Sequence, residues 1–147
     1  MTRDSQRCPQ VGVGIVVWRG NEVLLIKRGS EPRKGQWSLP GGKQRMGETV
    51  REASLREVAE ETGLVVTLTN LLDVTDSITT GVDGHILYHY TLVIFCSEWL
   101  SGEAHAGDDA ADICWITVDQ LNSVDMWDEA KRIIRISAEQ RAATMEA

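Results

Sequence analysis

The segment from Thr49 to Gly63 constrains the fold most, because it predicts a helix whose two ends are both defined. Thr49 and Glu52 have the spacing of a capping box at a helix N-terminus. Gly63 provides the residue type that most often ends a helix in the left-handed conformation. No proline or glycine interrupts the residues between them, so one helix of about four turns is expected here.

The predicted helix has two chemically different faces when its residues are placed at 100° intervals. One arc carries apolar or small side chains, namely Leu55, Val58, Ala59 and Thr62. The opposite arc carries three carboxylates, namely Glu57, Glu60 and Glu61. We therefore expect the first face to pack against the protein and the second to present the carboxylates.

Strand-like runs lie on both sides of this helix. They are rich in β-branched and other apolar residues and cover residues 11–18, 22–27, 65–76, 86–99 and 113–118. A helical turn is expected at 119–123, and a second helix at 125–141 with Ile133, Ile134 and Ile136 as apolar members. This order predicts an α/β fold in which helices cover both faces of a sheet.

Residues 28–47 form a glycine-, proline- and arginine-containing segment that predicts a long irregular connection. Long loops within compact domains are usually functional. Arg28 and Lys43 are the basic residues of this region that we favour for binding outer phosphates, ahead of Lys27, Arg33, Lys34 and Arg45.

The chain has 147 residues, which fits a single domain over 1–147, with residues 1–10 as a flexible N-terminus. Its net charge of −7 argues against binding to long nucleic acids or anionic membranes. No apolar run is long enough to span a bilayer, and no signal peptide is visible. The three cysteines lack a metal-binding spacing, so we expect reduced thiols in a cytoplasmic protein.

The charge is unevenly distributed along the chain. Residues 1–47 carry nine basic and three acidic side chains, whereas residues 48–61 carry two and five. Residues 98–112 carry five acidic side chains and no lysine or arginine. This distribution suggests two acidic segments beside a basic loop, which is compatible with a phosphate-containing small molecule when divalent cations are present.

Three glutamates at i, i+3 and i+4 lie on neighbouring positions of the helix surface. Such a cluster either faces water or binds a cation, and Mg²⁺ prefers carboxylate oxygens together with waters and phosphates. The Gly41-Gly42 pair allows a close approach of the backbone, so that a carbonyl there is available as a further ligand. Arg56 is placed to pair with Glu52 or Glu60.

The residues from Gly42 to Leu64 resemble the 23-residue signature of the Nudix hydrolases at every fixed position. The matched pattern is Gly42, five residues, Glu48, seven residues and then Arg56-Glu57-Val58-Ala59-Glu60-Glu61-Thr62-Gly63-Leu64. The preceding Trp37-Ser38-Leu39-Pro40-Gly41 is similar to the usual lead-in of that family. The resemblance extends over about residues 11–123.

This resemblance implies an α/β/α sandwich with a mixed sheet, and hydrolysis of a nucleoside diphosphate linked to another group with Mg²⁺ or Mn²⁺. It implies Glu57, Glu60 and Glu61 as side-chain metal ligands and Gly42 as a backbone ligand. Arg56 would belong to the catalytic set with Glu57 and Glu60 by orienting the glutamates. Glu57 is the favoured general base, and Asp108 or Asp109 in the later acidic loop is the alternative.

The resemblance does not fix the leaving group. The run Gly107 to Asp112 is similar to that of ADP-ribose pyrophosphatases, so ADP-ribose or a related nucleotide sugar is the first expectation, with Asp108 as a further metal ligand and Asp109 as a substrate contact. The alternatives are a mutator-type hydrolase of oxidised nucleoside triphosphates and a regulatory module without catalysis. The protein is expected to be a monomer or a homodimer.

Aromatic residues offer a site for a base. Along the strand that holds His85, Tyr88, His89 and Tyr90, alternate side chains face opposite sides, so one pair is available to stack on a base while the other packs in the core. Trp18, Trp99 and Trp127 are interpreted as packing residues.

Overall fold

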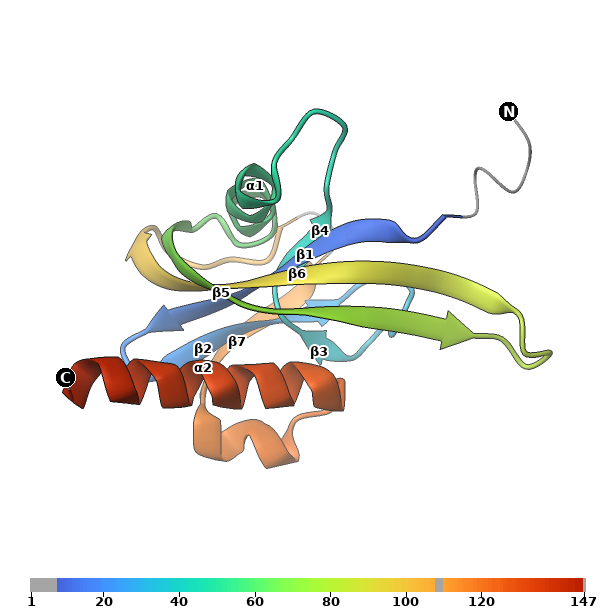
Figure 1. Ribbon diagram of the computed structural model, residues 1–147. Helices are drawn as coiled ribbons and strands as arrows, with labels where there is room; N and C mark the ends of the chain where they lie inside the picture. The colour runs from blue at the N-terminus through green and yellow to red at the C-terminus, as the bar shows by residue number, and fades with distance from the viewer. Residues whose placement is uncertain (1–7, 108–109, 147) are drawn as a thin grey trace.

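The computed structural model describes residues 8–107 and 110–146, and these form a mixed sheet of seven strands with a helix on each face (Figure 1). The elements are β1 (Gln10–Arg19), β2 (Glu22–Arg28), β3 (Trp37–Ser38), β4 (Gly41–Lys43), α1 (Val50–Thr62), β5 (Val65–Thr80), β6 (Ile86–Ser101), β7 (Ala110–Thr117), the short 3₁₀ helix η2 (Val118–Ser123) and α2 (Asp128–Glu146). The expected α/β/α sandwich is confirmed. Of the N-terminal segment expected to be flexible, residues 1–7 lie outside the described residues, and Gln10 already belongs to β1.

The sheet has the strand order β3-β2-β1-β6-β5, with β4 paired to β1 and β7 paired to β2. β1 and β6 are parallel, and the other strand pairs are antiparallel. β1 and β2 form a hairpin, but these strands pair only at Trp18↔Val23 and Arg19↔Glu22. Beyond that point β1 pairs with β4 at Gly12, Val13 and Gly14, which makes the Gly41-Gly42 pair part of the sheet.

Two hydrophobic cores lie on opposite faces of the sheet because successive residues of β1 point to opposite sides. Val13, Ile15 and Val17 belong to the core under α1, together with Ala53 and Val58 of that helix. Val16 and Trp18 belong to the other core, with Ala130, Ile133 and Ile134 of α2. The continuous apolar run of β1 is therefore explained by a strand covered on both faces.

Helix α1 begins and ends where the sequence predicts. Thr49 is the N-cap of a complete capping box with Glu52, and Gly63 adopts the left-handed conformation at φ 77°. The buried face matches the predicted one only in part. Val58 and Thr62 are buried as predicted, together with Ala53, Ser54 and Glu61, whereas Leu55 is 43 % exposed and Ala59 is exposed. The helix is turned so that part of its carboxylate face, not Leu55 and Ala59, faces the protein.

Helix α2 lies across the sheet face opposite α1 (Figure 1). Ile133 and Ile134 are fully buried, as predicted, whereas Ile136 is half-buried. Trp18 donates a hydrogen bond from Nε1 to Ser137 Oγ at 2.8 Å, which satisfies two buried polar groups in this core. Within the described ranges, neither helix is long and apolar enough to cross a membrane.

Candidate active site

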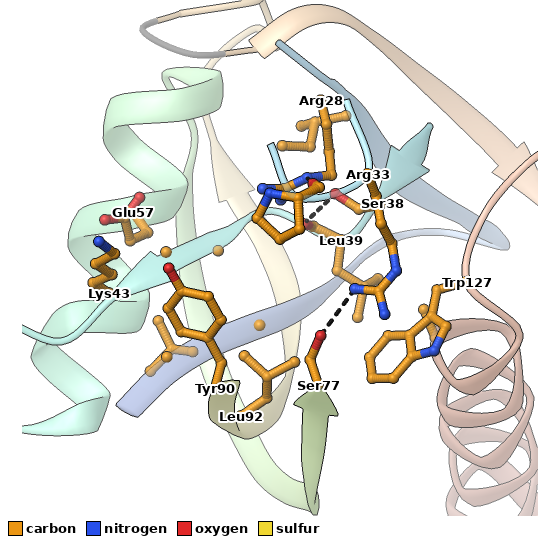
Figure 2. Close-up of a pocket in the computed structure, with 18 of the residues that line it drawn as sticks. Arg28, Arg33, Ser38, Leu39, Lys43, Glu57, Ser77, Tyr90, Leu92 and Trp127 are labelled. Atoms are coloured by element: carbon orange, nitrogen blue, oxygen red, sulfur yellow. Dashed lines mark hydrogen bonds between the residues drawn. The ribbon is translucent and has the colours of Figure 1, made fainter. Parts of the chain in front are cut away.

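A cavity of about 720 Å³ lies where β1, β4, β6, the loop after β2 and the start of α2 meet (Figure 2). Glu57 and Glu61 of α1 line one part of it, and Tyr88, Tyr90 and Trp127 line another. Arg28, Arg33, Lys43 and Arg45 add four basic side chains to the wall. The cavity therefore combines carboxylates, cations and aromatic rings, and its volume suits a nucleotide-sized ligand.

Glycine residues allow the strand backbone to approach α1 at this site. A Cβ atom on Gly42 would lie 2.5 Å from the carboxylate carbon of Glu57. A Cβ atom on Gly41 would collide with the Val13 carbonyl of the neighbouring strand. The Gly41-Gly42 pair is thus required by close packing on two sides, and it places the β4 backbone directly against a carboxylate of α1.

Arg56 holds the carboxylates of this region in fixed positions. Its guanidinium bonds both oxygens of Glu48, from Nε at 2.6 Å and from Nη2 at 2.9 Å. Nη1 donates to Glu57 at 2.7 Å and to Glu60 at 3.2 Å, and Nη2 also donates to the Lys43 carbonyl at 2.9 Å. Arg56 is therefore a positioning residue whose planar fork ties the loop to three carboxylates.

These hydrogen bonds also shift the pKa values of Glu48 and Arg56 in opposite directions. The hydrogen bond from Arg56 is the main cause that lowers the pKa of Glu48 to about 2. The same hydrogen bond, followed by that to Glu57, raises the pKa of Arg56. The predicted pairing of Arg56 with Glu60 is present, whereas Glu52 is used instead in the capping box of α1.

Glu61 is the most unusual acidic residue of the site. It is only 8 % exposed, and its Oε2 atom has no hydrogen-bond partner among the described residues. Burial raises the pKa of Glu61 to about 9, and the charge and hydrogen bond of neighbouring Glu57 act in the same direction. The Gly41 N–H and the charge of Arg28 oppose this shift without offsetting it. A buried carboxyl beside a second carboxylate is costly unless a cation or a proton neutralises it.

The three predicted metal-binding glutamates are not equivalent. Glu57 and Glu61 line the cavity, but Glu60 pairs with Arg56 at 3.2 Å and with Arg45 at 3.5 Å. Accordingly, no group of three acidic, histidine or cysteine side chains in residues 8–107 and 110–146 is arranged as a complete metal site. The unpartnered Glu61 oxygen and the close approach of the Gly42 backbone to Glu57 nevertheless fit a hard cation bound by oxygen atoms.

The predicted phosphate-binding residues and the predicted acidic-loop residues have different outcomes. Arg28 and Lys43 line the cavity, and Figure 2 shows Lys43 beside Glu57 and Tyr90. Asp108 and Asp109 lie outside the described residues. The segment just before them is anchored on the end of α1, because Gly107 donates its N–H to the Glu61 carbonyl at 2.9 Å.

The aromatic predictions are only partly correct. Tyr88 and Tyr90 line the cavity, but His89 faces the opposite side of β6 near Asp76. His85 precedes β6 in the turn, where it pairs with Asp83, and neither histidine is a core residue. Among the tryptophans, Trp18 is buried as predicted. Trp99 is instead 38 % exposed and hydrogen-bonds the Gly102 carbonyl.

Trp127 packs against the core beneath α2, as predicted, and it also lines the cavity, where the Arg33 guanidinium carbon lies 4.4 Å from its ring centroid. Arg33 comes from the loop that the sequence predicts, where Arg28 and Lys43 were preferred. Arg33 contacts Trp127 because of the path that this loop follows, and the residue types in the loop do not predict that path.

The profile of the NUDIX domain family matches residues 9–135. The chain belongs to the NUDIX family. It is 39 % identical over 113 residues to an ADP-ribose pyrophosphatase of Methanocaldococcus jannaschii, a match that covers 77 % of this chain and 64 % of that protein. It is also 39 % identical over 124 residues to the putative 8-oxo-dGTP diphosphatase 2 of Mycobacterium tuberculosis, which covers 84 % of this chain and 83 % of that one.

Solved structures of this NUDIX family have the same fold. The MutT NUDIX hydrolase from Burkholderia pseudomallei superposes with a TM-score of 0.68 at 32 % identity, covering 77 % of this chain and 86 % of that one. The NUDIX domain of Shewanella oneidensis NrtR, crystallised with ADP ribose, has a TM-score of 0.74 at 18 % identity and covers 95 % of this chain and 93 % of that one. At that identity the second likeness concerns the fold alone.

Proposed function

We propose that this chain is a metal-dependent pyrophosphohydrolase that cleaves the pyrophosphate bond of a small nucleoside diphosphate derivative. One observation carries the proposal: Glu57 and Glu61, a buried carboxyl with one unpartnered oxygen, face a nucleotide-sized cavity from the helix that bears the family signature. Two carboxylates in this position are unfavourable by themselves and favourable beside a bound cation.

Mg²⁺ or Mn²⁺ is the cofactor that fits these donors. Glu57 and Glu61 would bind it directly, with the Gly42 carbonyl as a backbone ligand, while Glu60 would join them on release from Arg45. Asp108 is a candidate further ligand from the acidic loop. When bound, the cation supplies charge neutralisation on the diphosphate and a more acidic water.

The residues of the chain divide the remaining tasks. Arg56 fixes the orientation of Glu57 and Glu60 through its hydrogen bonds at 2.7 and 3.2 Å. Glu57 is the proposed general base and would accept a proton from the attacking water. Asp108 or Asp109 is the alternative base. Arg28 and Lys43 would bind phosphate oxygens along the cavity wall, and Asp109 is a candidate contact to the substrate.

The substrate has two leading candidates. The sequence places ADP-ribose or a related nucleotide sugar first, and the name of the archaeal relative supports this. The name of the mycobacterial relative, which aligns over a larger share of its length, supports an oxidised nucleoside triphosphate. Either compound is a small molecule that the cavity can enclose, and a cytoplasmic location would suit both.

A substrate screen tests the proposal. Purified protein is incubated with Mg²⁺ or Mn²⁺ and with ADP-ribose, nucleotide sugars, dinucleoside polyphosphates and nucleoside triphosphates, and the products are separated by anion-exchange chromatography. Glu61→Gln serves as the matched control, because it removes one ionisable carboxyl and preserves its shape. Cleavage above that control supports the proposal, and release of AMP together with ribose 5-phosphate when ADP-ribose is the compound added identifies ADP-ribose as a substrate. No cleavage of any compound would instead support the regulatory alternative.

A further inference from the structure

Arg33 marks a part of the cavity that the proposed hydrolysis does not use. Figure 2 shows Arg33, Ser77 and Trp127 together on the side of the cavity away from Glu57 and Lys43. These residues come from the loop after β2, from β5 and from the segment just before α2. Three separate segments thus converge on one guanidinium group.

The charge of Arg33 is not neutralised by the part of the protein that the structure describes. Within residues 8–107 and 110–146 no carboxylate lies within salt-bridge distance of it, and Nη1 makes its side-chain hydrogen bond, to Ser77 Oγ at 2.9 Å. Burial, followed by the charge of Arg28, lowers the pKa of Arg33. Because half-buried charges are normally paired, the remaining N–H donors call for an acceptor from a ligand in the cavity.

The backbone at Arg33 has an energetically unfavourable conformation that places its side chain at the cavity. Arg33 has φ 61°, a left-handed backbone conformation that is uncommon for a residue other than glycine. The loop around it is fixed by hydrogen bonds from Arg28 Nε to the Pro32 carbonyl at 2.6 Å and from Gly35 N–H to the Arg28 carbonyl at 2.9 Å. Conformations of this kind persist where the surroundings enforce them, and they concentrate at ligand-binding sites.

We propose that Arg33 reads the carbonyl-bearing edge of a guanine-type base, and so sets the base preference of the enzyme. A guanidinium group only donates hydrogen bonds, and guanine offers two acceptors, O6 and N7, on one edge. Adenine has an amino group in place of O6, so a donor would face a donor. The rings of Tyr88 and Tyr90 provide flat surfaces in the same cavity for such a base.

This inference rests on the proposed function and concerns only the base. It does not decide between a sugar phosphate and a pyrophosphate as the leaving group. It does place guanine nucleotides ahead of ADP-ribose, which reverses the order expected from the sequence. The physical reason is that Arg33 cannot accept the hydrogen bond that an adenine amino group offers at that edge.

Matched substrates that differ only in the base test this inference. We expect the wild type to have a kcat/KM for dGTP and for dITP about tenfold or more above that for dATP, with the difference mainly in KM. GDP-glucose against ADP-glucose should give the same order. Arg33→Asn should bring the ratios near one, and asparagine is chosen because it tolerates the left-handed backbone. Lys34→Asn, at the exposed neighbouring position, should retain the wild-type ratios.

Binding without hydrolysis separates this inference from the proposed function. Calorimetric titration of GMP and AMP into metal-free protein should show the same preference for guanine, and its loss in Arg33→Asn. If GMP is preferred but no compound is cleaved, the proposed hydrolysis is wrong and the base inference holds. Equal use of both bases by the wild type would overturn the inference. So would a loss in Arg33→Asn that is the same for both bases, because it would show a structural or phosphate-binding role.

Discussion

Replacing Glu61 with glutamine tests whether the site stores electrostatic strain that a cation relieves. In the folded protein without metal, burial and the charge of Glu57 raise the pKa of Glu61 above its ordinary value of 4.5 to about 9. The folded state then retains a proton that the unfolded state loses as pH rises. Stability from this group is complete below pH 4.5 and decreases through the range up to about 9.

The size of the effect at pH 7 follows from the interval between 4.5 and 7. At about 1.4 kcal/mol per pH unit, this interval corresponds to about 3 kcal/mol of lost stability, because the folded-state pKa of Glu61 lies above 7. Glutamine resembles the protonated acid and can still donate to Glu57. We therefore expect Glu61→Gln without metal to be more stable than the wild type by up to about 3 kcal/mol at pH 7, and about equally stable near pH 4.5.

Urea unfolding monitored by tryptophan fluorescence, from pH 5 to pH 8.5 in the presence of EDTA, measures this difference. Glu139→Gln, which removes an exposed carboxyl from α2, is the control and should follow the wild type at every pH. Added Mg²⁺ should stabilise the wild type more than Glu61→Gln. Parallel pH dependence of the wild type and Glu61→Gln, or a less stable Glu61→Gln at pH 7, would refute the reasoning.

Three further predictions concern Arg56, the Gly41-Gly42 pair of β4 and the core beneath α2. Arg56→Lys keeps the charge but loses the two-pronged bond to Glu48, so steady-state kinetics should show kcat lowered about 10–100-fold; an unchanged kcat would contradict the positioning role. Gly42→Ala places a Cβ atom 2.5 Å from the Glu57 carboxylate carbon and should lower kcat/KM about 100-fold while circular dichroism shows a folded protein. Ile134→Ala removes a fully buried side chain and should reduce the free energy of unfolding by about 2–5 kcal/mol in urea, with kcat retained; a smaller loss would mean that the core collapses around it.

Helix α1 illustrates how far local sequence information reaches. Its limits are set by side chains that bond their own backbone, so Thr49, Glu52 and Gly63 predict them directly. Its rotation about its own axis is set by packing against β1 and β4, so the predicted apolar arc is correct for Val58 and Thr62 and wrong for Leu55. Leu55 remains 43 % exposed while Glu61 is buried, because the helix packs with Glu57 and Glu61 on the side of the Gly41-Gly42 backbone.

The loop after β2 also shows what local sequence information does not predict. Its composition predicts an irregular, functional connection, but the short strands β3 and β4 within it form only because β2 and β1 offer unpaired edges. Arg33 is one of several basic residues in that segment. Its contact with Trp127, a residue far along the chain, arises from tertiary structure alone.

The helix with its caps, the strand-rich segments around it and the glutamate pattern were determined by the sequence, because caps, turns and periodicity depend on residues close together in the chain. Tertiary structure decided that Glu61 is buried with one oxygen unpartnered, that Arg45 and Arg56 hold Glu60, and that Arg33 has no counter-charge within the described ranges. Those outcomes depend on desolvation and on distances between residues far apart in the chain. No local pattern encodes them, and they set the chemistry of the cavity.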